Sequence, residues 1–132
     1  GTNDLGRMRS PEETFGTLYE MIFDCINAGS KVVVCSIPSL KEIPGGSRSS
    51  AVTSRDEYNG RLKLLAEELG SEVCLFFDCH KATGSVVLDE VTKNNYTTLN
   101  PELAADNLHL TREGYQVIAK GVSECLEKFL VA

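Results

Sequence analysis

The chain has 132 residues, of which 42% are hydrophobic and 24% charged, a composition typical of one folded domain rather than of a disordered segment. Thirteen basic against nineteen acidic residues give a net charge of −6, so direct nucleic-acid binding, which needs a basic face, is not expected. No apolar run approaches the ~20 residues of a transmembrane helix, and the first residues do not resemble a signal peptide.

The first part of the chain predicts a helix followed by a strand. Ser10 caps the helix, Pro11 fits its first position, Glu13 closes a capping box, and Gly29 ends it. Residues 31–37 are apolar and rich in β-branched side chains. A run that is apolar on both faces is typical of a strand in a parallel sheet that helices cover on both sides.

A loop and a second helix follow this strand. Residues 39–51 are rich in Gly, Pro and Ser and predict a loop. A second capping box, from Ser54 to Glu57, predicts the start of a helix that ends at Gly70. The apolar stripe of this helix comprises Tyr58, Leu62, Leu65 and Leu69.

The second half of the chain predicts another strand and a last helix. Residues 72–77 form a second apolar run, which Asp78 closes. The polar stretch over residues 79–100 is hard to assign, and residues 86–88 within it are either a short strand or part of a packed loop. Thr111 then caps the last helix.

Alternation of helices and strands predicts right-handed crossovers and a parallel sheet with helices on both faces. Two strands are too few for a stable doubly wound sheet. We therefore expect residues 1–132 to be the C-terminal part of a single larger α/β domain. Residues 31–37 and 73–77 should be adjacent parallel strands with an open edge, and the chain should need its preceding segment to fold stably.

Asp106 and His109 are the first candidates for chemistry, because they lie on a loop just before the last helix. Such a carboxylate can accept the Nδ1 proton of the imidazole and leave Nε2 free as a general base. Alternatively, Asp106 only caps a turn and His109 packs under the helix. The Asp-x-x-His spacing alone favours the second interpretation.

Asn3 is the second candidate, in the segment Gly1-Thr2-Asn3-Asp4, which we expect to be a loop after a strand. A carboxamide can donate a hydrogen bond to a developing oxyanion. Asn-Asp after a glycine is equally ordinary turn chemistry.

The five cysteines show no disulfide or zinc spacing, and no metal or other cofactor is expected, although Cys74, Cys79 and His80 lie close in sequence. Cys35 and Cys74 lie in apolar runs and are predicted to be small buried residues. Free cysteines weakly favour a reducing, cytoplasmic location.

Taken together and in order, the two loops resemble the SGNH (GDSL-type) hydrolase superfamily. Gly1-Thr2-Asn3-Asp4 is similar to its third sequence block, and Asp106-Asn107-Leu108-His109 is similar to its fifth. The resemblance implies a flavodoxin-like, three-layer α/β/α fold with a parallel sheet. Its members include acetylhydrolases and esterase domains of first-open-reading-frame proteins of LINE-type retrotransposons, which contain a similar Gly-Thr-Asn-Asp.

The resemblance also implies a Ser-His-Asp triad acting on small acyl-ester or lipid substrates. His109 would be the base, Asp106 its orienter and Asn3 an oxyanion donor, with Gly1 supporting the loop. The family's serine nucleophile and second oxyanion donor belong to blocks upstream of Gly1, so the nucleophile is not in this chain. The alternative function is a non-catalytic, flavodoxin-like binding or interaction module.

Overall fold

The computed structural model describes residues 1–43 and 49–131. The centre of the loop predicted over residues 39–51 thus lies outside the described residues. The elements are, in order, α1 (Thr2–Gly6), α2 (Pro11–Asn27), β1 (Val32–Cys35), α3 (Ser49–Leu69), β2 (Cys74–Phe77), α4 (Cys79–Thr83), β3 (Gly84–Leu88), β4 (Asn95–Leu99), a 3-10 turn (Pro101–Leu103) and α5 (Arg112–Leu130).

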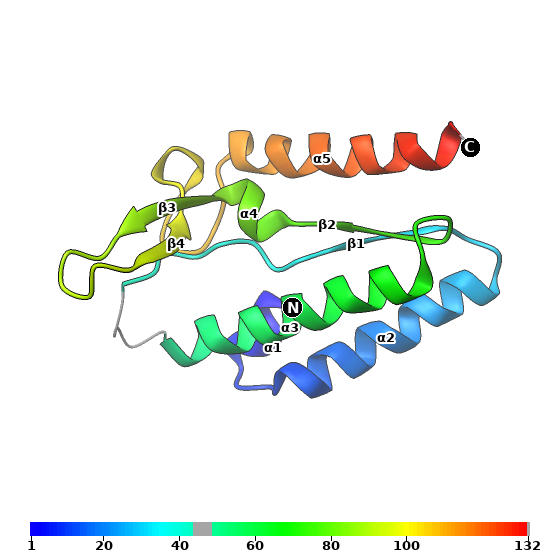
Figure 1. Cartoon of the computed structure of the whole chain (residues 1–132), viewed down its shortest axis with the longest axis horizontal. Coiled ribbons are helices and arrows are strands. Elements are labelled where there is room, and N and C mark those ends of the chain that lie inside the picture. Colours follow the sequence, from blue (N-terminus) through cyan, green and yellow to red (C-terminus); the bar gives the residue numbers. More distant parts are fainter. Residues whose placement is uncertain (44–48, 132) are drawn as a thin grey trace.

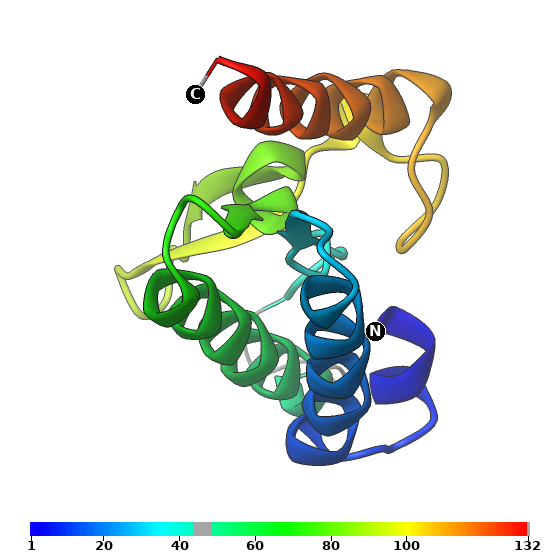
Figure 2. The ribbon, with the colours of Figure 1, turned by 90° about the vertical axis from the view of Figure 1, so that its right-hand side faces the viewer.

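β1 and β2 form the parallel pair that the sequence predicts, with Val32 opposite Cys74 and Cys35 opposite Phe77. The pair lies between α5 on one face and α2 with α3 on the other (Figure 1, Figure 2). In the part of the chain that the structure describes, each strand has one sheet neighbour, so both outer edges are open. The chain is therefore an α/β fold built on a small parallel pair of strands.

The core lies on the face of the strand pair that α2 and α3 cover. Leu62 is fully buried at its centre, and the apolar stripe predicted for the second helix supplies much of the rest. Burying such side chains contributes about 1.5–3 kcal/mol each. The buried members of this cluster are Leu5, Ile22, Val34, Ile37, Tyr58, Leu62, Leu65, Ala66 and Cys74.

Two predicted helix starts are confirmed by their caps. The Glu13 N–H donates to Ser10 Oγ over 3.1 Å, and the Gly114 N–H donates to Thr111 Oγ1 over 3.2 Å. Each hydroxyl thus satisfies one of the amide groups that have no partner within the first helical turn.

The predicted start of the second helix at Ser54 is wrong. In the structure α3 already includes Ser49, so Ser54 lies inside the helix. Next to it, the Arg55 side chain is 2% exposed and its Nη1 pairs with Glu42 Oε1 over 2.6 Å. This tertiary ion pair, which no local sequence pattern encodes, holds the first turns of α3 against the segment after β1.

The structure also corrects the expectation for residues 1–4 and assigns residues 86–88, which the sequence left open. The segment Gly1-Thr2-Asn3-Asp4 is not a loop but enters α1, because the Leu5 N–H donates to the Gly1 carbonyl over 3.0 Å and Leu5 anchors the turn in the core. Residues 86–88 belong to a strand, β3, which pairs with β4 in an antiparallel hairpin.

Cys35, predicted to be buried, is exposed. It ends β1, which has a single sheet neighbour among the described residues. A hydrogen bond with Cys79 lowers the pKa of the Cys35 thiol to about 7.

Candidate active site

Asp106 organises the loop before α5 with both of its carboxylate oxygens. Oδ1 accepts the backbone N–H of Leu108 over 2.7 Å and that of His109 over 2.6 Å. Oδ2 lies 2.8 Å from His109 Nδ1. The carboxylate therefore both caps the turn and orients the imidazole, so the two alternatives for Asp106 are compatible. His109 itself does not pack under α5, since its side chain is 67% exposed.

These hydrogen bonds fix the charge of Asp106. The backbone N–H of His109, then that of Leu108 and then the His109 ring lower the pKa of the Asp106 carboxyl to about 2. An ionised carboxylate can only accept, so Nδ1 of His109 carries the proton of this hydrogen bond. The neutral imidazole then presents an unprotonated Nε2, the state that a general base requires.

Asn3 and His109 line the same pocket although they are far apart in the sequence. This pocket has a volume of about 410 Å³ and is lined by residues 1–4, 38–39, 108–110 and Tyr115. Gly1 also lines it, and a Cβ added there would lie 2.8 Å from the Ile37 side chain. The fold thus brings all four residues singled out from the sequence, Gly1, Asn3, Asp106 and His109, to one end of the strand pair.

A larger, mostly apolar pocket of about 660 Å³ adjoins the first one. Thr2 and Leu108 line both pockets and so form their common wall. Leu5, Ile37 and Leu40 contribute apolar surface to the larger pocket. An apolar cavity beside an Asp–His pair can accommodate the apolar part of a ligand while its polar part lies near the imidazole.

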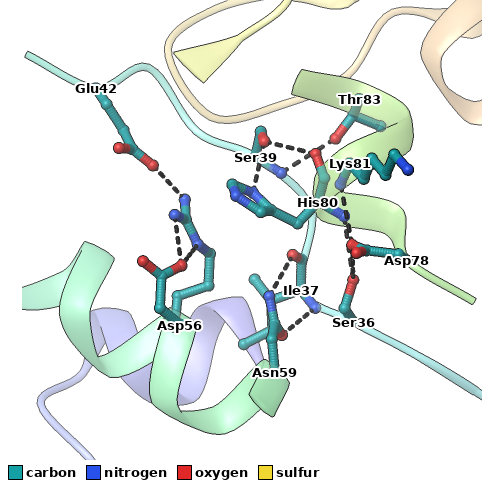
Figure 3. A network of polar contacts seen from close by, with 11 residues as sticks. Ser36, Ile37, Ser39, Glu42, Asp56, Asn59, Asp78, His80, Lys81 and Thr83 are labelled. Atoms are coloured by element: carbon teal, nitrogen blue, oxygen red, sulfur yellow. Dashed lines mark hydrogen bonds and ion pairs between the residues drawn. The ribbon is translucent and has the colours of Figure 1, made fainter. Parts of the chain in front are cut away.

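A second polar network lies where β1 and β2 end, and one of its members, Ser39, lines the smaller pocket (Figure 3). Ser36 Oγ donates to Asp78 Oδ1 over 3.1 Å and accepts the His80 N–H over 3.1 Å. Asp78 also caps α4 by accepting the Lys81 N–H over 3.0 Å. The two contacts of Ser36 join residues 42 and 44 positions apart in the sequence, and they tie the segment after β1 to α4.

Ser39 and His80 form the centre of this network. Ser39 Oγ donates to the His80 carbonyl over 2.8 Å and lies 2.7 Å from His80 Nδ1. A hydroxyl has a single proton, and the carbonyl can only accept it, so Nδ1 must be the donor in the second contact. Burial, followed by the nearby Arg55 guanidinium, lowers the pKa of His80. The ring is therefore neutral near pH 7, with its proton on Nδ1.

The Ser39–His80 pair does not have the geometry of an activated nucleophile. Ser39 is 1% exposed, and its hydroxyl proton points to a carbonyl rather than to a basic nitrogen. Sequence reasoning did not single out this pair. The available signal was the occurrence of Ser36 and Ser39 at the end of one predicted strand and of Asp78 and His80 just after the next, because parallel strands bring such positions to one edge.

Among residues 1–43 and 49–131, no group of three or more His, Cys, Asp or Glu side chains is placed to hold a metal ion. None of the helices in the described ranges combines the length and apolar character that crossing a membrane requires.

Comparison with solved structures agrees with this arrangement of elements. A GDSL-like lipase from Bacteroides thetaiotaomicron VPI-5482 superposes with a TM-score of 0.74 at 23% identity, over 97% of this chain and 59% of that one. A candidate acylhydrolase from Bacteroides fragilis NCTC 9343 superposes with a TM-score of 0.70 at 24% identity, over 92% of this chain and 54% of that one. The chain thus spans little more than half the length of either protein.

No curated protein matches the sequence. Residues 1–117, however, match the GDSL-like lipase/acylhydrolase family along their whole length, and this segment contains all four predicted site residues. The chain therefore belongs to the GDSL-like lipase/acylhydrolase family, of whose related structures it covers about half.

Proposed function

We propose that residues 1–132 supply the base, its orienter and one oxyanion donor of a serine esterase. The observation that carries the proposal is the 2.8 Å contact between Asp106 and His109 at a pocket that Asn3 also lines. An ionised carboxylate on Nδ1 leaves Nε2 of His109 free to take a proton, and the Asn3 carboxamide can donate to an oxyanion.

In this proposal the nucleophilic serine comes from a segment outside residues 1–132. Its hydroxyl attacks the ester carbonyl while Nε2 of His109 takes the hydroxyl proton, and the carbonyl oxygen becomes the oxyanion. The intermediate collapses by breaking the ester C–O bond, and His109 returns the proton to the departing alcohol. Water then hydrolyses the acyl-enzyme by the same route and regenerates the serine.

The neighbouring pocket of about 660 Å³ supports an acyl ester or lipid as the substrate. Its mostly apolar lining can hold an acyl chain, and the shared wall of Thr2 and Leu108 supports a position of that chain next to His109. Neither proposed step requires a metal or another cofactor.

The test is hydrolysis of p-nitrophenyl acetate by the full-length protein that contains residues 1–132. We expect His109→Ala to lower kcat/KM by a factor of about 10³, because it removes the general base. Gln116→Ala, an exposed and neutral position on α5, is the matched control and should retain wild-type activity. Equal hydrolysis by His109→Ala and wild type would overturn the role of His109 as the base, and no hydrolysis by either would favour the non-catalytic binding module.

We also propose that the strand pair is completed by neighbouring strands of the same domain, giving a flavodoxin-like sheet. The open edges of β1 and β2 support this, because unpaired backbone groups beside apolar strands favour association. We expect isolated residues 1–132 to lack a cooperative, monomeric urea transition followed by circular dichroism. A cooperative transition with a native-like slope would mean that these residues form a complete domain.

A further inference from the structure

The segment after β1 connects the buried network to the candidate active site. Pro38 and Ser39 line the pocket of Asn3 and His109. Two residues further on, the Lys41 N–H donates to the Asn107 carbonyl over 2.9 Å, and Asn107 lies between Asp106 and His109. Any displacement of this segment would therefore move a wall of the pocket, and the Lys41–Asn107 contact joins that wall to the loop of Asp106 and His109.

Three elements hold this segment: Asn59 of α3 exchanges hydrogen bonds with the Ile37 backbone, the Leu99 N–H of β4 donates to the Leu40 carbonyl, and side chains of α4 hold Ser39 between them. The Ser39 N–H donates to Thr83 Oγ1 over 3.1 Å, and Thr83 Oγ1 in turn donates to the Cys79 carbonyl over 2.7 Å. The Ser39 hydroxyl contacts both the carbonyl and the Nδ1 of His80. His80 is the one titratable side chain among these contacts, and its ring spans the gap between α4 and the segment (Figure 3).

We propose that His80 is a positioning residue for the esterase reaction, which donates from Nδ1 to Ser39 and thereby fixes the pocket wall beside Asn3 and His109. The inference rests on the proposed function. His80 is not among the residues that line the pocket, so we expect it to act through Ser39 rather than by contacting the substrate. Its effect should appear in substrate binding, because a wall contacts the substrate equally in the ground state and the transition state.

The chemistry of the side chain allows a selective substitution test. In asparagine, the amide nitrogen occupies the place of Nδ1, two bonds from Cβ, so His80→Asn keeps a donor for Ser39 Oγ. In glutamine, the amide nitrogen is one bond further out, near the place of Nε2, and does not reach the hydroxyl. His80→Ala removes the donor altogether, so the three variants separate the donor at Nδ1 from the mere presence of a polar side chain.

The experiment measures p-nitrophenyl acetate kinetics and the NMR signals of the His109 ring in the full-length protein. We expect His80→Ala and His80→Gln to raise KM about fivefold with kcat changed less than about twofold, the effect of one lost hydrogen bond on a binding wall. The His109 ring signals should shift in both variants, and His80→Asn should restore KM and these signals. Lys81→Ala, an exposed neighbour that joins the network through its backbone N–H, should behave as wild type.

Two results would overturn the positioning role: wild-type KM and unchanged His109 signals in His80→Ala, or equal impairment of the Ala, Gln and Asn variants. If His80→Ala does not fold, Ser39→Ala removes the same hydrogen bond from the other side and must reproduce the rise in KM. Absence of hydrolysis by the wild-type protein counts against the proposed function alone. In that case the shift of the His109 signals in His80→Ala, and its reversal in His80→Asn, still decides the positioning role.

Discussion

The chain contains two sets of one aspartate and one histidine close to the same end of its strands, and the two sets differ in the contacts that hold them. Asp106 and His109 are exposed and contact each other within a single turn, three residues apart. Asp78 and His80 do not pair with each other but reach back 41 to 44 residues, to Ser36 and Ser39. Asp106 and His109 are exposed and depend on local contacts, so they are available for chemistry. Asp78 and His80 are half-buried and make long-range contacts, so they are suited to holding the segment after β1 against α4.

Matched substitutions of the two aspartates give the largest expected difference. Asp106→Asn keeps an oxygen for the Leu108 and His109 N–H groups but loses the negative charge on Nδ1. We expect kcat of the full-length protein to fall by about 10²–10³, because the imidazole loses its orienter and the stabilisation of its charged form. Asp78→Asn should change kcat less than about threefold. A larger loss of kcat in Asp78→Asn than in Asp106→Asn would reverse the two assignments.

The free energy of unfolding should depend more on the region around Ser39 and His80 than on the loop of Asp106 and His109. A Cβ at Gly84 would lie 2.5 Å from the Thr97 side chain, 2.8 Å from Ser39 Oγ and 2.9 Å from the His80 carbonyl. Since the last contact is with backbone, we expect Gly84→Ala to lower the free energy of unfolding by about 1–3 kcal/mol. His109→Ala, at an exposed loop position, should change it by less than about 0.5 kcal/mol. Urea unfolding measures both, and equal destabilisation would contradict the division into a structural and a chemical region.

The pH dependence gives the smallest expected difference, and the two sets respond in different ranges. The pKa of His80 is below its ordinary value of 6.5 because of burial and Arg55, so the unfolded chain takes up a proton first as the pH falls. The free energy of unfolding should therefore decrease as the pH falls below 6.5, and this decrease should be smaller in His80→Asn.

The pKa of Asp106 is lowered to about 2, so its contribution to stability is complete above pH 3.8 and is lost as the pH falls through 2. An NMR titration of the Asp106 carboxyl should show a midpoint well below 3.8. A midpoint at 3.8 would mean that the hydrogen bonds from Leu108, from His109 and from its ring do not persist in solution.

The elements that could be predicted from the sequence are those whose signals are local. Ser10 and Thr111 cap their helices through bonds that span three residues, and the two apolar runs became β1 and β2. The Asp106–His109 contact belongs to the same class, because three residues within one turn suffice to form it. Such features depend on backbone geometry and side-chain reach over a few residues, which a sequence pattern encodes directly.

Which of these local features contact one another depends on the packing of the whole chain. The parallel register of β1 and β2 brings Ser39 to His80, and the packing of α1 on α2 and α3 and of α5 on the strand pair brings Asn3 to the pocket of His109. The early start of α3, with the buried pair of Arg55 and Glu42, was likewise invisible in the sequence. Contacts of this kind join positions dozens of residues apart, and their geometry is set by strand register and helix packing rather than by any neighbouring residue.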